Sequence, residues 1–363
     1  MPRRTATMLA SILTLIALLC AGVLIPVPYS EMSPGPTVNT LGEHGGEPVL
    51  QVSGHKTYPA SGNLNMTTVR VTGADYRMNL FEAVYGWLSH DNAVVPHNTL
   101  YPDGQTAEQA NQENAEEFSQ SQESAKVAAL RQLDIPVSAR VVVGSVVKGS
   151  PAQGRLHAGD VIKAVDGKRI AQPGDVAKVV TRHEPGEKVE FTIVPAKAAA
   201  AAEKAGKPEP RGTRTVTVPT KKAPGDDRAI VGIQAGTDHT FPFEVDIKLA
   251  DVGGPSAGLM FALGIVDKLT PGDLTGGTFV AGTGTIEDDG TVGPIGGIEM
   301  KTVGARGKGA RYFLTPEDNC AAAARDVPAG LTLVKVDTIR DAVTSLEKIR
   351  KGDTGQLPEC AKG

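Results

Sequence analysis

The chain has 363 residues, of which 40 % are hydrophobic and 4 % aromatic, and its formal net charge at pH 7 is -4. This length allows two or three domains, each with a core of its own. The slightly acidic balance and the scarcity of aromatic side chains argue against a basic or base-stacking surface, so no nucleic acid partner is expected.

The first predicted element is an uncharged apolar stretch from Met8 to Val27, preceded by Arg3 and Arg4. Twenty such residues are enough for one membrane-spanning helix. A cleaved signal peptide usually has a shorter apolar region and a small-residue cleavage site, and neither is clear before Pro26. We therefore expect an uncleaved transmembrane signal anchor over 8–27, with the N-terminus in the cytoplasm and the bulk of the chain outside it.

Residues 28–48 contain several prolines and are predicted to form an extended tether. Segments rich in β-formers then predict strands at 48–52 and 63–71. Residues 106–133 contain no glycine or proline and are rich in Ala, Glu, Gln, Lys and Leu, which predicts one long helix or two, ending near Pro136.

The middle of the chain predicts a mainly β region. Strands are expected at 140–147, 161–165, 188–194 and 214–218, with a helix over 175–183. The alanine-rich, low-complexity stretch 197–212 is expected to be a mobile hairpin extension.

The motif "GSPAQGRLHAGDVIKAVDGKRI" (149–170) and this order of elements resemble a PDZ domain of bacterial envelope proteases. The resemblance implies binding of an extended peptide as an added strand, with its carboxylate held by a loop before the second strand. We predict that loop at 135–139 and name Val137, Ser138 and Ala139 as peptide-binding residues, although the loop lacks a Gly-apolar-Gly-apolar sequence. The alternative is a domain that serves assembly alone.

Gly254-Pro-Ser-Ala-Gly258 fits the G-x-S-x-G pattern of hydrolases whose nucleophilic serine begins a helix. Serine is also a favoured helix N-cap, so the pattern alone does not make Ser256 a nucleophile. An esterase of this type needs a histidine after the serine, and the last histidine is His239. The histidine and cysteine spacings predict no metal site, and no cofactor is expected.

Lysine is the remaining base, and Lys301 is the candidate. It follows "GTVGPIGGIEM" and shares a predicted helix face with Ile298 and Ala305, where burial would favour the neutral amine. This pattern alone favours a lysine that covers the helix face and keeps its ammonium in water. Lys268 lies about 18 Å along the helix from Ser256, which is too far.

Three blocks in order, "GGPSAGLMFALGIVDKLT", "AGTGTI" and "DGTVGPIGGIEMKTVGARGKGARYFLTPEDN", resemble the proteolytic domain of the Lon family of serine proteases. The resemblance implies a catalytic Ser256–Lys301 dyad, with Thr283 holding the lysine amine. The backbone amides of Gly254, Ser256 and Ala257 are assigned to the oxyanion. Two positions depart from the family: Gly253 replaces an acidic residue, and Thr285 replaces a glutamate.

The helix at 120–135 is similar to the one that precedes the serine block in Lon proteases. We therefore expect an α+β fold in which a PDZ-like β-rich domain is inserted into a Lon-type proteolytic domain. The alternative is a string of separate domains. The predicted divisions are 49–133 for the N-terminal part of the protease unit, 134–222 for the PDZ-like domain, 223–350 for the proteolytic domain and 351–363 for a tail.

The predicted function is that of a membrane-anchored serine endopeptidase, a hydrolase that cleaves unfolded or membrane-tethered proteins and binds substrate peptides through its PDZ domain. No G-x-x-x-x-G-K-[ST] motif occurs, so proteolysis is expected to be independent of ATP. The Lon resemblance implies a homo-oligomeric ring. The alternative function is a catalytically silent PDZ scaffold at the membrane. Pairing of Cys320 with Cys360 stays open.

Overall fold

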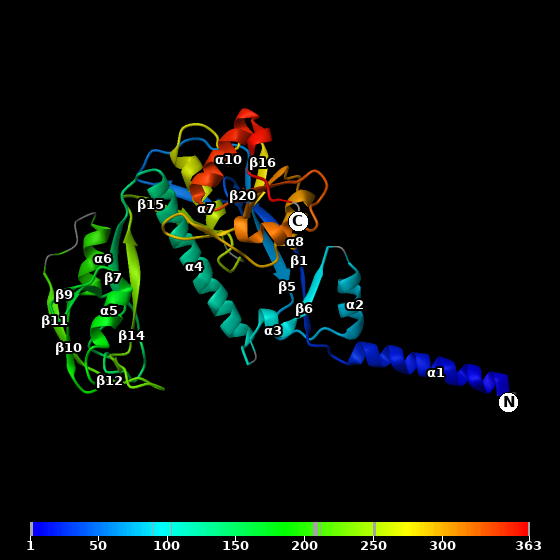
Figure 1. Ribbon diagram of the computed structural model, residues 1–363, viewed down its shortest axis with the longest axis horizontal. Helices are drawn as coiled ribbons and strands as arrows, with labels where there is room; N and C mark the ends of the chain where they lie inside the picture. Colours follow the sequence, from blue (N-terminus) through cyan, green and yellow to red (C-terminus); the bar gives the residue numbers. More distant parts are fainter. Residues whose placement is uncertain are drawn as a thin grey trace. The chain divides into compact units, whose positions relative to one another are not determined.

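The computed structural model describes residues 3–89, 91–102, 104–205, 210, 212–249 and 252–361. The chain forms two compact units. The first combines Met1–Ile135 with Phe243–Gly363, and the second, Pro136–Pro242, lies between these two parts in the sequence. Figure 1 shows this by colour, because blue and orange segments share the first unit and green segments form the second. The predicted mixed fold with an inserted β-rich domain is confirmed.

The chain begins with helix α1 (Arg3–Leu24), which is long and apolar enough to cross a membrane. This is a statement about its length and composition, and a signal sequence would meet the same criterion. Gly22 is the buried residue of α1, and the other side chains of the helix are largely exposed.

The segment after α1 differs from the predicted tether at 28–48, because it contains strand β1 (Tyr29–Asn39). β1 pairs with β5 (Asn63–Val71) on one side, and its first four residues pair with β6 (Ala93–Pro96) on the other. Pro34 and Pro36 lie at an irregularity in the β1–β5 register, past the end of β6. Proline is tolerated at bulges and unpaired edges because its missing N–H breaks no ladder bond there.

The main sheet of the first unit draws strands from both parts of the chain, in the order β20-β19-β16-β5-β1-β6. β5 and β16 are parallel neighbours at the join. The C-terminal strands are β16 (Phe279–Gly282), β19 (Tyr312–Pro316) and β20 (Thr332–Val336). Since strands that flank the second unit pair directly, neither flank completes this sheet alone.

Helices α4, α7 and α10 pack together in the first unit, and α8 packs on β1 and β5. Their bounds are α4 (Ala107–Gln132), α7 (Gly258–Leu269), α8 (Ile298–Gly307) and α10 (Ile339–Lys351). Thr106 caps α4 with a capping box, which agrees with the predicted start of that helix. α7 is buried almost throughout, and the Phe118 ring of α4 lies edge-on to Phe261 of α7.

Shorter elements complete the first unit. They are β2 (Glu43–His44), β3 (Glu47–Pro48), β4 (Leu50–Ser53), α2 (Leu80–Leu88), α3 (His97–Leu100), β15 (Glu244–Ile247), β17 (Thr285–Ile286), β18 (Val292–Gly293), η1 (Glu317–Asn319), α9 (Cys320–Ala323) and η2 (Thr354–Gln356). β4 pairs with β15, so the two parts of the chain also meet at this small sheet.

Asp267 of α7 is fully buried. One carboxylate oxygen accepts a hydrogen bond from the Leu274 amide, and among the described residues the other has no partner. The pKa of Asp267 is raised from 3.8 to about 6, mainly by burial; the hydrogen bond from Leu274 opposes this shift, and the nearby Asp273 charge adds to it. A buried carboxylate is therefore ionised at a cost at neutral pH.

Asp267→Asn is expected to increase the free energy of unfolding at pH 7 by about 1–3 kcal/mol, because the amide keeps an acceptor for Leu274 without a charge. In the wild type, the neutral Asp267 acid contributes to the free energy of unfolding. This contribution is fully present below pH 3.8 and is lost as the pH rises through about 6. Urea unfolding at pH 4 and pH 7 measures both effects. An equal pH dependence in wild type and variant would contradict this assignment.

The second unit is built on the sheet β11-β10-β8-β7-β14, with β9 (Lys168–Arg169) paired to β8. The five strands are β7 (Ser138–Val146), β8 (Val161–Val165), β10 (Lys188–Val194), β11 (Arg214–Pro219) and β14 (Ile233–Thr240). Helix α5 (Pro173–Val180), β12 (Lys221–Lys222) and β13 (Ala229–Ile230) complete it. β13 and β14 lie beyond residue 222, where the sequence analysis ended the domain.

The alanine-rich stretch contains helix α6 (Ala196–Lys204), which differs from the predicted hairpin extension at 197–212. Ala199 is buried in a small cluster with Val142, Val161 and Val194. Alanine has the highest helix propensity, so a run of alanines favours a helix wherever one side can pack. Residues 206–209 and 211 of the predicted extension lie outside the described residues.

Cys320 and Cys360 form a disulfide that joins the start of α9 to the C-terminal segment. The bond closes a sequence separation of 40 residues and packs in an apolar cluster with Phe313 and Leu333.

Replacing both cysteines with serine is expected to lower the free energy of unfolding by about 2–4 kcal/mol, because the unfolded chain regains the freedom of that loop. Thermal unfolding with and without a reductant measures the effect, and the reductant should lower the stability of the wild type but not of the double variant.

Candidate active site

Ser256 lies in the turn that leads into α7. Gly254 has a φ of 79°, in the left-handed region that favours glycine, and so allows the chain to turn sharply before the serine. The Ser256 carbonyl oxygen accepts two hydrogen bonds, from the Thr283 hydroxyl at 2.9 Å and from the Gly284 amide at 3.0 Å. The backbone at Ser256 is therefore fixed against the loop that follows β16.

Lys301 belongs to α8, and its side chain reaches Ser256 from this second helix. Its Nζ lies 2.8 Å from Ser256 Oγ, 3.1 Å from Thr283 Oγ1 and 3.0 Å from the Thr67 carbonyl oxygen of β5. The structure thus brings together Ser256, Thr283 and Lys301, three of the residues that the sequence analysis selected. It also adds Thr67, which that analysis did not identify.

The Lys301 side chain is not a snorkelling lysine, since the residue is only 2 % exposed. Burial lowers the pKa of Lys301 from 10.5 to about 7. The hydrogen-bond partners of Nζ are a hydroxyl of serine, a hydroxyl of threonine and a carbonyl oxygen, none of which carries a negative charge. A substantial fraction of Lys301 is therefore neutral near pH 7.

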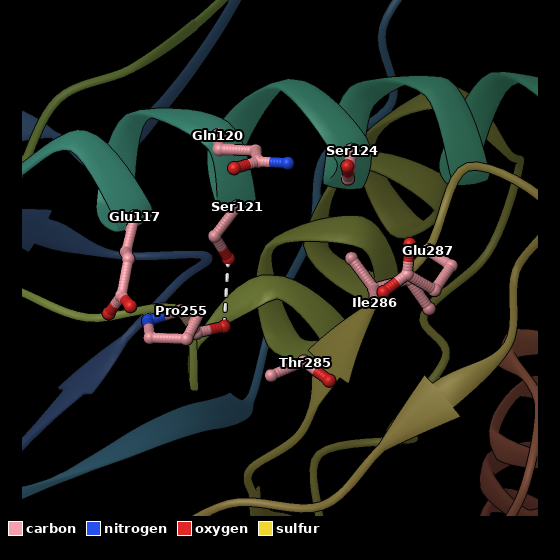
Figure 2. Close-up of a pocket in the computed structure, with 8 residues that line it drawn as sticks. All are labelled: Glu117, Gln120, Ser121, Ser124, Pro255, Thr285, Ile286 and Glu287. Atoms are coloured by element: carbon pink, nitrogen blue, oxygen red, sulfur yellow. Dashed lines mark hydrogen bonds between the residues drawn. The ribbon is translucent and has the colours of Figure 1, made fainter. Parts of the chain in front are cut away.

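Helix α4 holds the backbone just before Ser256. Ser121 Oγ donates a hydrogen bond of 2.9 Å to the Pro255 carbonyl oxygen, and Figure 2 shows this bond as a dashed line. The Asn114 carbonyl oxygen accepts a hydrogen bond of 3.0 Å from the Gly254 amide. The Gly254 amide, which the sequence analysis assigned to the oxyanion, is thus occupied by another partner.

The amides of Ser256 and Ala257, unlike that of Gly254, are available to bind an oxyanion. Within the described part of the chain, neither donates a backbone hydrogen bond. The Ser256 amide shares a peptide unit with the Pro255 carbonyl, which accepts a hydrogen bond from Ser121. The Ala257 amide shares one with the Ser256 carbonyl, which accepts hydrogen bonds from Thr283 and Gly284. In a trans peptide the N–H points away from the C=O, so these bonds fix the direction of both amides. They also lie at the N-terminus of α7, where the helix dipole favours negative charge.

Ser121→Ala is expected to lower kcat of any reaction that develops an oxyanion at Ser256 by about 10-fold, because the Pro255–Ser256 peptide unit loses its fixed orientation. KM should change little. Ser119→Ala, at an exposed position of the same helix, is the matched control and should leave kcat unchanged. Steady-state kinetics on a peptide substrate measure both, and equal kcat values for the two variants would contradict this role for Ser121.

A polar pocket of about 270 Å³ opens beside Pro255, between α4 and β17. Its lining residues are Glu117, Gln120, Ser121, Ser124, Pro255, Thr285, Ile286 and Glu287. Thr285, one of the two departures from the Lon pattern, therefore forms part of this pocket wall. Within the described part of the chain, no cluster of three or more His, Cys, Asp or Glu side chains is arranged to hold a metal ion.

In the second unit, an apolar groove of about 460 Å³ lies along α5 and the segment leading into β14. Val137, Ser138 and Ala139, predicted to bind peptide, do not line it. Ser138 and Ala139 begin β7 and already pair with Thr240 and His239 of β14. The side of these two residues that faces β14 is therefore occupied within the sheet.

The groove is lined instead by Arg228–Ile233, which the sequence analysis did not select, and by residues of α5. β14 is the last strand of its sheet, so one edge of it is unpaired among the described strands. Gly232 has a φ of 80°, and a Cβ there would lie 2.2 Å from that of Ser150, which excludes a larger residue. The apolar-Gly-apolar sequence Val231-Gly232-Ile233 was the signal that could have identified this loop.

Two family models match the chain, one reaching from α4 into the second unit and the other within the first unit. The model of the PDZ domain matches residues 113–197, and that of the Lon protease (S16) C-terminal proteolytic domain matches residues 250–348. The second match includes Ser256, Thr283 and Lys301.

Among curated proteins, the chain is similar to the Lon protease of Phenylobacterium zucineum (strain HLK1), with 37 % identity over 107 residues. The match covers 28 % of this chain and 13 % of that relative's length.

Among solved structures, the chain is similar to the PDZ domains of SdrC-like proteins from two Listeria species. For Listeria monocytogenes the identity is 20 %, the TM-score is 0.21, and 26 % of this chain and 86 % of that chain are covered. For Listeria innocua the identity is 22 %, the TM-score is 0.21, and 28 % of this chain and 98 % of that chain are covered. The family models and the curated relative lead to one conclusion: the chain carries a PDZ domain and the C-terminal proteolytic domain of Lon (S16) proteases.

Proposed function

We propose that the protein is a membrane-anchored serine endopeptidase that cleaves peptide bonds with a Ser256–Lys301 dyad. The observation that carries this proposal is the 2.8 Å contact between Ser256 Oγ and the buried Nζ of Lys301, whose pKa is lowered to about 7. A serine needs a neighbouring base, and a lysine serves as one only when it is neutral at working pH.

The hydrogen-bond donors and acceptors around Lys301 Nζ support this role. Thr283 Oγ1 donates its hydrogen to the Ser256 carbonyl, so it accepts one hydrogen from the amine, and the Thr67 carbonyl accepts another. A neutral amine has two hydrogens and one lone pair. The lone pair then faces Ser256 Oγ, which donates its hydrogen to Nζ. Thr283 and Thr67 are positioning residues in this scheme.

In the first half of the reaction, Ser256 Oγ forms a bond to the substrate carbonyl carbon as its proton moves to Lys301 Nζ. The carbonyl oxygen becomes an oxyanion, and the amides of Ser256 and Ala257 stabilise it. The C–N bond then breaks, and the ammonium of Lys301 gives its proton to the leaving amine. An acyl ester on Ser256 remains.

Water completes the reaction. Lys301, neutral again, takes a proton from the water molecule as its oxygen attacks the ester carbon. The second tetrahedral intermediate collapses, the bond to Ser256 Oγ breaks, and Lys301 returns the proton to Oγ. The carboxylic acid product leaves, and the enzyme is restored without any cofactor.

Two surfaces are proposed to bind the substrate. The pocket beside Pro255 accepts a substrate side chain, and Glu117 and Glu287 in its wall disfavour acidic side chains. In the PDZ domain, the unpaired edge of β14 adds an extended peptide as a further strand, while the apolar groove along α5 takes its side chains.

The proposed location is the cell membrane, with α1 as a single-pass anchor, the N-terminus in the cytoplasm and the rest of the chain outside. Arg3 and Arg4 at the start of α1 support that orientation. The Cys320–Cys360 disulfide also supports it, because such bonds persist in oxidising compartments. Unfolded or membrane-tethered proteins are the proposed substrates, degraded without ATP, and the Lon resemblance suggests a homo-oligomeric ring.

Degradation of an unfolded protein, such as reduced and alkylated casein, by the full chain in detergent tests this proposal. Cleavage into peptides is expected at the same rate with and without ATP. A folded, tightly packed protein should resist cleavage. If the full chain binds casein but leaves it intact under all these conditions, the silent PDZ scaffold is the better description.

A further inference from the structure

Helix α2 (Leu80–Leu88) exposes its large apolar side chains. Tyr85, Trp87 and Leu88 are 75 %, 80 % and 77 % exposed. Three further large apolar residues of the helix are about half exposed, and we refer to all six as the α2 face: Leu80, Phe81, Val84, Tyr85, Trp87 and Leu88. A helix on the surface of a soluble protein normally shows the opposite pattern, with its apolar stripe towards the core.

The inner side of α2 explains how the helix is held in this orientation. Its buried residues are the small Ala83 and Gly86. A Cβ on Gly86 would come within 2.8 Å of the Val94 side chain of β6, so the helix backbone lies close against that strand. A complete capping box between Asn79 and Glu82 fixes the first turn. The apolar side therefore faces outward in a well-anchored helix.

The start of α2 lies at the end of α1. The Val27 amide donates a hydrogen bond of 2.8 Å to the Met78 carbonyl oxygen, and Pro26 forms an isolated bridge with Asn79. The Phe81 ring also contacts α1, since a Cβ on Gly22 would lie 2.6 Å from it. Figure 1 shows α2 beside the C-terminal end of α1. The α2 face is thus continuous with the apolar surface of the candidate membrane helix.

We propose that the α2 face lies in the interfacial layer of the lipid bilayer that α1 crosses. This inference rests on the membrane anchoring proposed above. Tryptophan and tyrosine suit that layer, because each ring is apolar at one end and carries a hydrogen-bonding group at the other. The face itself contains no ionisable acid or base apart from the Tyr85 phenol, and Glu82 lies off it, bonded to Tyr76 and to the Asn79 backbone.

This placement has a consequence for the first unit. α2 packs on β1 and β6, which belong to the same sheet as β5, the strand that supplies the Thr67 carbonyl to Lys301. An α2 helix seated in the lipid interface would hold that sheet at a fixed height above the membrane. The first unit would then be attached to the membrane at two places, α1 and α2, rather than through α1 alone.

The chain contains a single tryptophan, Trp87, so its fluorescence reports directly on the α2 face. The full chain is reconstituted in vesicles of phosphatidylethanolamine and phosphatidylglycerol, with lipids brominated either near the headgroup or near the bilayer centre. Headgroup-side bromine is expected to reduce Trp87 emission about twofold, and central bromine much less. Aqueous iodide should quench Trp87 weakly in vesicles.

Trp87→Phe combined with Phe243→Trp moves the reporter to the residue before β15 as a control. Its emission should be insensitive to brominated lipid. Flotation of the vesicles tests membrane anchoring separately from the placement of the α2 face. A chain that does not float with the vesicles contradicts anchoring itself. A floating chain whose Trp87 is quenched by iodide and not by lipid overturns the interfacial placement. Shielding from both quenchers also overturns it and indicates a second copy of the chain on this face.

Discussion

Replacing Lys301 with methionine is expected to lower kcat/KM for peptide cleavage by about 10³-fold or more, because no other base lies within hydrogen-bonding distance of Ser256 among the described residues. Methionine has a similar length and suits a buried position. The variant should therefore fold, and assays on a short unfolded peptide measure the loss directly. Lys308→Met, at the exposed C-terminal end of α8, is the matched control and should keep full activity.

The same residue sets the expected pH dependence. The ammonium form of Lys301 cannot accept the serine proton, so kcat/KM of the wild type should rise with pH through about 7 and then level off. Because burial disfavours the charged form, the stability cost of protonating Lys301 is fully present below pH 7. It disappears as the pH rises towards 10.5, a difference of about 5 kcal/mol.

Lys301→Met should therefore be more stable than the wild type at neutral pH and yet almost inactive. This combination distinguishes a catalytic lysine from a structural one, whose removal would lower stability and activity together. A variant that loses stability, or a wild-type rate that is flat between pH 6 and pH 8, would contradict the neutral-amine mechanism.

Ser256→Ala is expected to lower cleavage by at least about 10⁴-fold, since it removes the atom that forms the acyl ester. The alanine fits the same turn, and the Ser256 carbonyl would keep its bonds to Thr283 and Gly284, because these involve only the backbone at residue 256. Peptide binding by the PDZ domain should be unchanged. Cleavage kinetics and isothermal titration with a substrate peptide measure the two properties separately.

Covalent labelling adds a direct test of the nucleophile. A peptide boronate or fluorophosphonate should modify the wild type at Ser256 and leave Ser256→Ala unmodified. Labelling at another residue, together with residual cleavage above a tenth of the wild-type rate, would assign the nucleophile elsewhere.

The residues around Ser256 and Lys301 could be predicted because each lies in a short, distinctive stretch of sequence. Gly254-Pro-Ser-Ala-Gly258 marks the turn before α7, and the block ending at Lys301 marks the start of α8. The absence of a histidine after Ser256 argued against an esterase, and the resemblance to Lon proteases implied Lys301 as the base. The structure brings these two side chains to 2.8 Å from one another, with Thr283 beside both.

Contacts across long sequence separations could not be predicted in this way. Thr67 meets Lys301 through a backbone carbonyl, which every residue has, so no side-chain pattern marks it. Ser121 is one serine among several on α4, and only the packing of α4 on α7 shows that it faces Pro255. Strand β1 was not predicted because it contains prolines, which its unpaired edge and its bulge tolerate.

The apolar groove of the second unit also lies away from the loop predicted at 135–139. That loop was expected before the second strand of the domain, whereas the groove borders β14, the last strand of this unit in sequence, which forms an edge of the sheet. Strand order in space does not follow from strand order in the chain. Val231-Gly232-Ile233 carried the local signal, and its position beyond residue 222 placed it outside the predicted domain.

The main sheet also determines when the proposed enzyme can become active during its synthesis. Thr67 and Lys301 are 234 residues apart and are separated by the whole inserted unit. The Lys301 amine therefore lies in water, with an ordinary ammonium charge, until α8 packs on β5 in the folded first unit. A partly synthesised chain would carry Ser256 without its base, so the proposed protease could not cleave itself or its neighbours before its folding is complete.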